Sequence, residues 1–293
     1  MKRKLLRRTV ELQAYALTVL LLVLAAHLTL DFSWEFWGLW LGRPELAPQA
    51  HLGLAALLLY QPIFMDILPQ YILYLLVSPW LILLVARGRW LDVVAGSLLL
   101  WLLVQLGLHM PMAARLDHLL QALVPGFALR TAFNVLAWQI VFVSGLVAGT
   151  LGATGQLDWR SVLRPDRAGL AKACLAILVA LAVWRLGLTF ELWGREAMDH
   201  FWARERREEF SLVFLLNFAA LAYLVAWLLV AGPGSSSSIC RASAAGLQRL
   251  FTLPALMLLG RHSLQVYATT SSWPMPWSRP TGTWARSAPR PRP

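Results

Sequence analysis

Residues 210–231 read FSLVFLLNFAALAYLVAWLLVA, a stretch that contains no charged side chain. A run of more than about 18 mostly apolar residues is long enough to cross a bilayer as an α-helix. Runs of this kind recur along the chain, at residues 12–30, 66–86, 91–108, 132–151 and 168–190. The sequence therefore predicts an all-α fold, a polytopic transmembrane helical bundle.

The composition supports this prediction and excludes several other classes of protein. The 293-residue chain is 58% hydrophobic and 14% charged, whereas about a quarter of the residues of a soluble protein are charged. Its 2 cysteines exclude a disulfide framework and a cysteine-rich metal site. The sequence contains no Gly-rich phosphate loop, His-Glu-x-x-His or Cys-x-x-Cys motif. We therefore expect no metal site and no bound cofactor.

The formal net charge of +11 is concentrated at the two ends of the chain. The basic residues there are Lys2, Arg3, Lys4, Arg7 and Arg8 at the amino end, and Arg279, Arg286, Arg290 and Arg292 at the carboxyl end. A basic cluster beside an apolar helix is a topology signal that can also contact anionic lipid headgroups. We expect the lipid bilayer, and no nucleic acid, as the partner.

Charge and length together predict about seven spans. The seventh, Phe251 to Ala268, is the weakest because it contains several polar residues. The apolar stretch 52–60 would form a helix of only about 14 Å, so we expect an interfacial or re-entrant helix there. The loops that carry basic residues then lie on the same side as the amino terminus, and the positive-inside rule places this side in the cytoplasm.

Two segments differ from the spans in composition. Residues 232–238 are rich in glycine and serine and predict a flexible linker. Residues 269–293 contain six prolines and four arginines without an acidic residue. Such a segment cannot bury enough apolar surface to fold. We therefore expect a transmembrane domain over residues 1–268 and a disordered tail over 269–293.

Several polar residues lie at membrane depth, where they are costly unless they face a cavity or a partner. They are Asp66, Gln70, Asn134, Gln139, Arg185, Arg261, His262 and Gln265. One interpretation is a polar pocket that opens outward and binds a substrate. The alternative is hydrogen bonding between helices, with charged groups reaching the membrane rims. Among these residues, Asp66 is the best candidate for an ionic partner of Arg261. Outside the spans, residues 204–209 carry charges of both signs and predict a solvated helix end.

Three segments resemble motifs of the OpgC-type membrane proteins, which group with the membrane acyltransferases. They are FMDILPQYI at residues 64–72, NVLAWQ at 134–139 and LGRHSLQVY at 259–267. The segments occur in the order of that family and at plausible spacing. The resemblance covers about residues 1–268.

This resemblance implies transfer of an acyl group, typically succinyl, to hydroxyls of periplasmic glucans. The donor would be a cytosolic acyl-CoA, such as succinyl-CoA. His262 is the one histidine inside a motif of the family, so it is the candidate catalytic base or hydrogen-bond donor. The other polar residues at membrane depth, Asp66 and Arg261 foremost, would bind and position the substrate.

The sequence also departs from the family pattern. The family begins with a helix that resembles Arg-x-Asp-x-x-Arg-Gly and is followed by a histidine, the base in related acyltransferases. No Asp-x-x-Arg-Gly occurs here, and the resemblance stops after Ala268. We therefore expect a copy truncated at both ends that does not transfer acyl groups by itself. The alternative function is a non-catalytic bundle, transporter-like or a scaffold.

Overall fold

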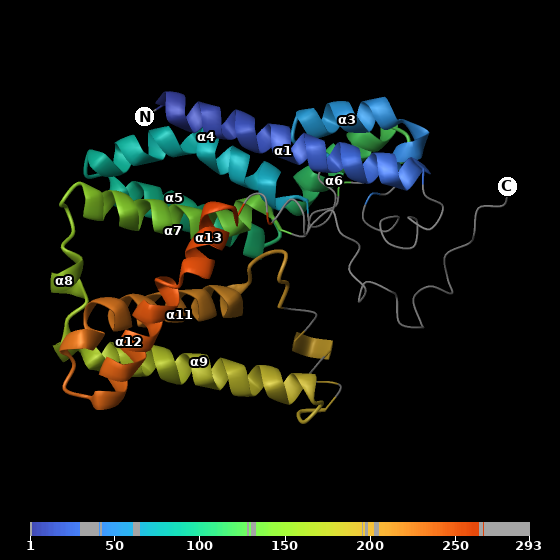
Figure 1. The fold of residues 1–293 in the computed structure, drawn as a ribbon. Helices are drawn as coiled ribbons and strands as arrows, with labels where there is room; N and C mark the ends of the chain where they lie inside the picture. The colour runs from blue at the N-terminus through green and yellow to red at the C-terminus, as the bar shows by residue number, and fades with distance from the viewer. Residues whose placement is uncertain are drawn as a thin grey trace. The chain divides into compact units, whose positions relative to one another are not determined.

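The structure, a computed structural model, describes residues 2–29, 41, 43–60, 65–127, 129, 133–194, 196, 199–201, 205–263 and 266. Every regular element in these ranges is helical (Figure 1). Five of the helices are long and apolar enough to cross a membrane, and up to seven spans result if each of two bent helix pairs is one span. The predicted polytopic helical bundle is therefore confirmed.

The elements have the following bounds. They are α1 (Lys2–Thr29), η2 (Pro44–Leu46), α3 (Pro48–Ala56), α4 (Ile67–Ala86), α5 (Trp90–Gln105), α6 (Met110–Leu123), α7 (Val135–Ala153), α8 (Trp159–Val162), η3 (Pro165–Arg167), α9 (Ala168–Thr189), α11 (Leu212–Val230), η4 (Gly232–Gly234), α12 (Ser238–Phe251) and α13 (Pro254–Arg261). The chain divides into two compact units, one built from residues 1–76 with 110–132 and the other from 77–109 with 133–262.

The first unit contains α1, α3 and α6 around one apolar cluster. Buried members of this cluster are Leu20, Val23, Leu24, Leu41, Ala55, Tyr60, Leu120, Val124 and Phe127. The Gln13 amide of α1 donates hydrogen bonds to the carbonyls of Ala55 and Ala56, at 3.4 and 3.2 Å. These carbonyls lie in the last turn of α3, where the N–H partners of a continuing helix are missing. The Ala55 carbonyl also accepts the Leu58 backbone N–H at 3.0 Å. The Gln13 side chain of α1 thus supplies hydrogen-bond donors to the carbonyls at the end of α3.

The second unit is built from two pairs of helices, α5 with α7 and α9 with α11, each of which lies side by side in Figure 1. Helices α5 and α7 pack against the end of α4 through one apolar cluster. Its buried members are Val85, Val93, Val143, Val147 and Leu151. Trp227 is buried against Ala171 where α11 meets α9. Its indole donates a hydrogen bond to the Arg164 carbonyl at 2.9 Å, so this large side chain leaves no buried polar atom unpaired.

Several segments differ from the sequence-based expectation. The short helix expected over 52–60 is α3, which begins earlier, at Pro48, and ends at Ala56. Residues 110–123, which were not among the expected spans, form α6, which is bent by 73° from α5. Gly107 between the two helices has φ of 70°, a conformation that glycine adopts without strain and that permits the sharp turn.

The expected seventh helix from Phe251 to Ala268 is interrupted near its start. Helix α12 ends at Phe251, and α13 begins at Pro254 after a bend of 51°. Proline lacks the N–H that a continuous helix would need there, but it fits the first position of a new helix. The expected linker over 232–238 is also ordered, because η4 forms there and Ser237 caps α12. The tail over 269–293 lies outside the described residues.

Candidate functional site

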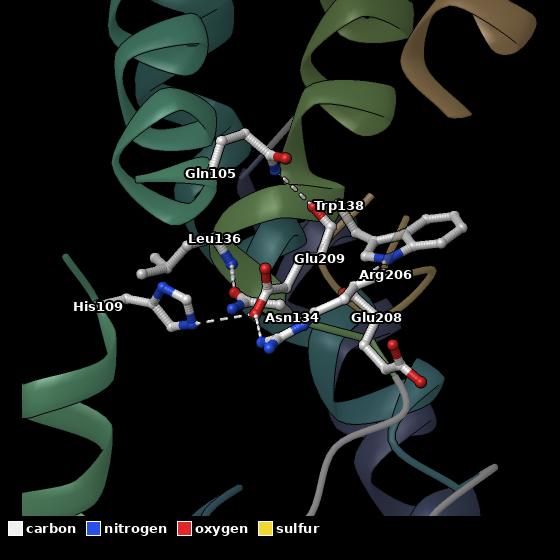
Figure 2. A network of polar contacts seen from close by, with 8 residues as sticks. All are labelled: Gln105, His109, Asn134, Leu136, Trp138, Arg206, Glu208 and Glu209. Carbon is white, nitrogen blue, oxygen red and sulfur yellow. Dashed lines mark hydrogen bonds and ion pairs between the residues drawn. The ribbon is translucent and has the colours of Figure 1, made fainter. Parts of the chain in front are cut away.

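A charged segment, residues 205–211, is held by side chains of α5 and α7. The carbonyl oxygens of residues 207–210 all accept hydrogen bonds from these side chains. Trp101 and Gln105 of α5 each donate one bond of 2.8 Å, and the Trp138 indole of α7 lies 3.2 and 3.3 Å from two carbonyls. The backbone of the charged segment is therefore fixed at the end of these two helices (Figure 2).

Asn134 joins the charged segment to the start of α7. Its side-chain oxygen accepts a hydrogen bond from the Leu136 N–H at 3.0 Å, as an N-cap does. Its backbone N–H donates to the Glu208 carbonyl at 2.8 Å. Asn134, predicted to bind substrate, thus has a structural role in this position.

The side chain of Glu209 lies between a guanidinium and an imidazole, as Figure 2 shows. Arg206 Nη1 is 3.1 Å and His109 Nε2 is 3.9 Å from Glu209 Oε1. Glu209 and His109 are only 18% and 14% exposed, which differs from the expected solvated helix end. The Nδ1 atom of His109 is buried and has no hydrogen-bond partner in the described part of the chain. This cluster can bind a polar group through its carboxylate and its guanidinium.

Phe210 follows Glu209 in a left-handed backbone conformation, with φ of 47°. Such a conformation costs a residue with a side chain about 1–2 kcal/mol, so the surroundings must impose it. The Phe210 side chain is buried, and its ring centroid lies 4.6 Å from that of Trp138 and 6.2 Å from that of Phe218. Packing of this ring therefore reinforces the hydrogen bonds that hold the charged segment.

Gln139 forms a pair of hydrogen bonds between α5 and α7. Its side-chain oxygen accepts a bond of 2.7 Å from the Ser97 hydroxyl, and its amide donates a bond of 2.8 Å to the Ser97 carbonyl. Both side chains are buried, with 7% and 6% exposure. This geometry agrees with the structural alternative for Gln139, hydrogen bonding between helices. Its predicted substrate contact stays a prediction.

Asp66 directly precedes α4, and Gln70 lies in its first turn, in the first unit. Asp66 is fully buried, and its carbonyl accepts the Gln70 backbone N–H at 3.1 Å. The Gln70 amide donates to the Tyr74 hydroxyl at 2.6 Å, one turn further along. The segment that carries the first motif therefore places a buried carboxylate and a buried amide one turn apart at the start of α4.

His51 of α3 is a buried polar residue that the sequence analysis did not single out. Its Nδ1 lies 2.9 Å from the Ala47 carbonyl, and its ring meets that of Tyr60 edge to face at 4.9 Å between centroids. Its Nε2 is buried without a hydrogen-bond partner in the described ranges. A small cavity of about 20 Å³ in the same unit is lined by Leu17, Leu20, Ala55, Tyr60, Met65 and Pro69.

The remaining predicted residues lie on the second unit or outside the described residues. Arg185, near the end of α9, is exposed, and its guanidinium lies 5.8 Å from the centroid of the Phe201 ring. Arg261 ends α13 and His262 follows as its C-cap, both with exposed side chains. Gln265 lies outside the described residues. The pairing of Asp66 with Arg261, which belong to different units, stays a prediction.

Comparison with known families gives one match. The model of the family described as OpgC protein matches residues 1–272. The chain belongs to this family. No curated protein matches the chain. No solved structure matches it either.

The OpgC match includes all three motif segments that the sequence analysis singled out, 64–72, 134–139 and 259–267. In this OpgC protein the sequence analysis missed His51, His109 and Glu209. One signal for His109 was available in the sequence, because a histidine directly follows the apolar run 91–108. Within the described ranges, no group of three or more His, Cys, Asp or Glu could hold a metal ion.

Proposed function

We propose that this OpgC protein acts in O-acyl transfer, in which a succinyl group from a cytosolic acyl-CoA is attached to a hydroxyl of a periplasmic glucan. The observation that carries the proposal is the family match over residues 1–272. The five helices that can span a membrane agree with a protein that couples a cytosolic donor to an acceptor on the opposite side. The proposed location is the bacterial inner membrane, with the amino terminus in the cytoplasm.

The proposed reaction needs a base and groups that stabilise negative charge. The acceptor hydroxyl loses its proton to the base while its oxygen attacks the thioester carbonyl. The new ester bond forms, the carbon–sulfur bond breaks, and the CoA thiolate leaves and takes up a proton. Histidine is the most frequent base in such steps, and His262 is our candidate. Arg261 beside it would stabilise the oxyanion or the succinyl carboxylate.

The other predicted residues would position the acceptor. Asp66, Gln70 and Gln265 can hydrogen-bond to sugar hydroxyls, and Arg185 can bind the succinyl carboxylate. Asn134 and Gln139 complete the proposed set. A second function, a non-catalytic membrane bundle, is favoured by a specific observation. Gln139 and Asn134 both use their side chains in hydrogen bonds within the protein.

Binding of the acceptor separates the two functions. The chain, reconstituted in nanodiscs, is titrated with purified periplasmic glucan that lacks succinyl groups, and the bound glucan is counted through a tritium label. We expect saturable binding that Asp66→Asn weakens at least tenfold while the helical content stays unchanged. Folded protein that binds no glucan would overturn the proposal and favour the non-catalytic bundle.

Asn134 offers a sharper variant because serine caps a helix about as well as asparagine. Asn134→Ser therefore keeps the start of α7 and removes the amide that would contact the acceptor. Weaker glucan binding at unchanged stability supports a substrate contact, whereas unchanged binding limits Asn134 to its structural role. Because the sequence lacks Asp-x-x-Arg-Gly, we expect no transfer of labelled succinyl from succinyl-CoA by this chain alone. If transfer is measured, its loss in His262→Gln, but not in the exposed control His118→Gln, would identify His262 as the base.

A further inference from the structure

Helix α12 exposes a row of apolar side chains. Ile239 and Leu250 are 76% and 46% exposed. They are separated by about three turns of helix, at 3.6 residues per turn, so they lie along one face. Phe251, at the end of α12, is 53% exposed. An apolar row of this kind on one helix face is unfavourable in water and requires a partner.

The rest of α12 is polar and basic. Arg241, Gln248 and Arg249 are exposed and lie away from the row formed by Ile239 and Leu250. The Arg241 guanidinium donates to the carbonyls of residues 235 and 236 at 2.7 and 2.9 Å, so it is held by backbone groups that carry no net charge. The sequence contains no aspartate or glutamate after Glu209.

In the described part of the chain, the neighbouring elements do not neutralise these arginines either. Asp166 of η3, the element beside Gly234, forms an ion pair with Arg164, at 3.1 Å between Oδ1 and Nε. The basic face of α12 thus carries an excess of positive charge and complements a negatively charged surface.

The position of α12 in the chain places it at the end of a membrane span. Helix α11, the most apolar candidate span, ends at Val230, and η4 follows directly. Ala244 of α12 is fully buried against this turn, so closely that a Cβ at Gly232 would lie 2.8 Å from the Ala244 Cβ. Because α12 packs on the turn that follows α11, it lies against the end of this candidate span.

We propose that α12 lies in the membrane–water interface and binds anionic phospholipid headgroups of the bilayer. Ile239 and Leu250 enter the boundary between headgroups and acyl chains, while Arg241 and Arg249 contact the phosphates. A helix with one apolar face, a basic face and low overall hydrophobicity is typical of this location. Its 14 residues give a length of about 21 Å, too short to cross the hydrocarbon core by itself, and α13 continues at an angle of 51°.

Fluorescence quenching in nanodiscs tests the depth of α12. In the full chain with Cys174→Ser and Cys240→Ser, an environment-sensitive fluorophore is attached to Ile239→Cys, Gln248→Cys or Leu250→Cys. We expect a nitroxide at carbon 5 of the acyl chains to quench positions 239 and 250 at least twofold more than one at carbon 12. Aqueous iodide should quench position 248 instead. Stronger quenching by carbon 12, or iodide quenching at all three positions, would overturn the interfacial placement.

A second measurement tests the headgroup. The nitroxide is carried either by phosphatidylglycerol or by phosphatidylcholine, at equal total amounts of both lipids. We expect the phosphatidylglycerol probe to quench position 250 more strongly, and Arg241→Gln/Arg249→Gln to bring the ratio close to one. Arg249→Gln alone keeps the contacts of Arg241 and should lower the ratio in part.

Arg89→Gln/Arg164→Gln removes the same charge from arginines that already have carboxylate partners, at 2.6 and 3.1 Å, and serves as the matched control. It should leave the quenching ratio unchanged. Equal quenching by both lipids in the parent protein, or an equal loss of preference in this control, would overturn the role of the α12 arginines. Burial of the labelled face in a dimer, seen as no quenching by lipid or iodide, would also overturn the proposal.

Discussion

The paired hydrogen bonds between Ser97 and Gln139 make a quantitative prediction about stability. The two bonds, of 2.7 and 2.8 Å, join α5 to α7 at buried positions. Hydrogen bonds between transmembrane helices contribute about 0.6 kcal/mol on average and up to about 1.7 kcal/mol. We compare Ser97→Ala, Gln139→Leu and the double variant, because only Ser97→Ala leaves a buried polar group without a partner.

Ser97→Ala removes one bond and leaves the Gln139 side-chain oxygen buried without a donor. An unsatisfied buried group costs about 1–3 kcal/mol. Gln139→Leu removes both bonds, but the Ser97 hydroxyl can turn to a carbonyl of its own helix, as serine does in helices. We therefore expect Ser97→Ala to lower the free energy of unfolding by about 1–2 kcal/mol, and Gln139→Leu by about 1 kcal/mol. The double variant should cost less than the sum, because no polar group is left unpaired.

Reversible unfolding in mixed micelles, with the mole fraction of dodecyl sulfate as the variable, measures these free energies. Ser144→Ala is the matched control, since its hydroxyl bonds to the Val141 carbonyl of the same helix at 2.9 Å on an exposed face. Strictly additive losses, or a loss for Ser97→Ala no larger than that for Ser144→Ala, would refute the reasoning. The double variant also tests a substrate contact of Gln139, because it leaves no buried polar group unpaired, whereas it would lose glucan binding.

Three further predictions concern other parts of the chain. In intact cells a membrane-impermeant thiol reagent should label neither cysteine. After lysis it should label Cys240 alone, because Cys174 is buried in α9. Labelling of Cys240 in intact cells would contradict a cytoplasmic position of this residue. Gly126→Ala should lower the melting temperature, because φ is 78° and the new Cβ would lie 2.6 Å from a backbone oxygen; an unchanged melting temperature would contradict this. If Asp66 and Arg261 pair, Asp66→Asn and Arg261→Gln each lower the yield of folded protein, and the double variant is no worse than either; additive losses would exclude the pair.

The length and position of the main spans could be read from the sequence. A helix in hydrocarbon satisfies all of its backbone hydrogen bonds internally and needs apolar side chains along its length. Both requirements are local, so runs such as 66–86 and 168–190 correspond to α4 (Ile67–Ala86) and α9 (Ala168–Thr189) within a few residues. The three OpgC motifs are local as well, which is why the family was evident without a structure.

Helix ends and bends were less predictable. The turn after α5 depends on Gly107, and the break before α13 on Pro254. Both residues are visible in the sequence, but an apolar run that continues past them hides their effect. Met110–Leu123 is not evident as a helix in the sequence because its polar residues interrupt the apolar pattern, although they lie on one side of an amphipathic helix.

The partners of the polar side chains were decided by the tertiary structure alone. Ser97 meets Gln139 across 42 residues, and Trp101 meets the Phe210 carbonyl across 109. Which polar groups meet depends on how each helix is rotated about its axis and shifted along it. Apolar contacts elsewhere along the two helices set both the rotation and the shift. The sequence alone therefore determined that this chain is a membrane bundle of the OpgC type, while helix packing decided that Glu209 is enclosed and that Gln139 bridges two helices.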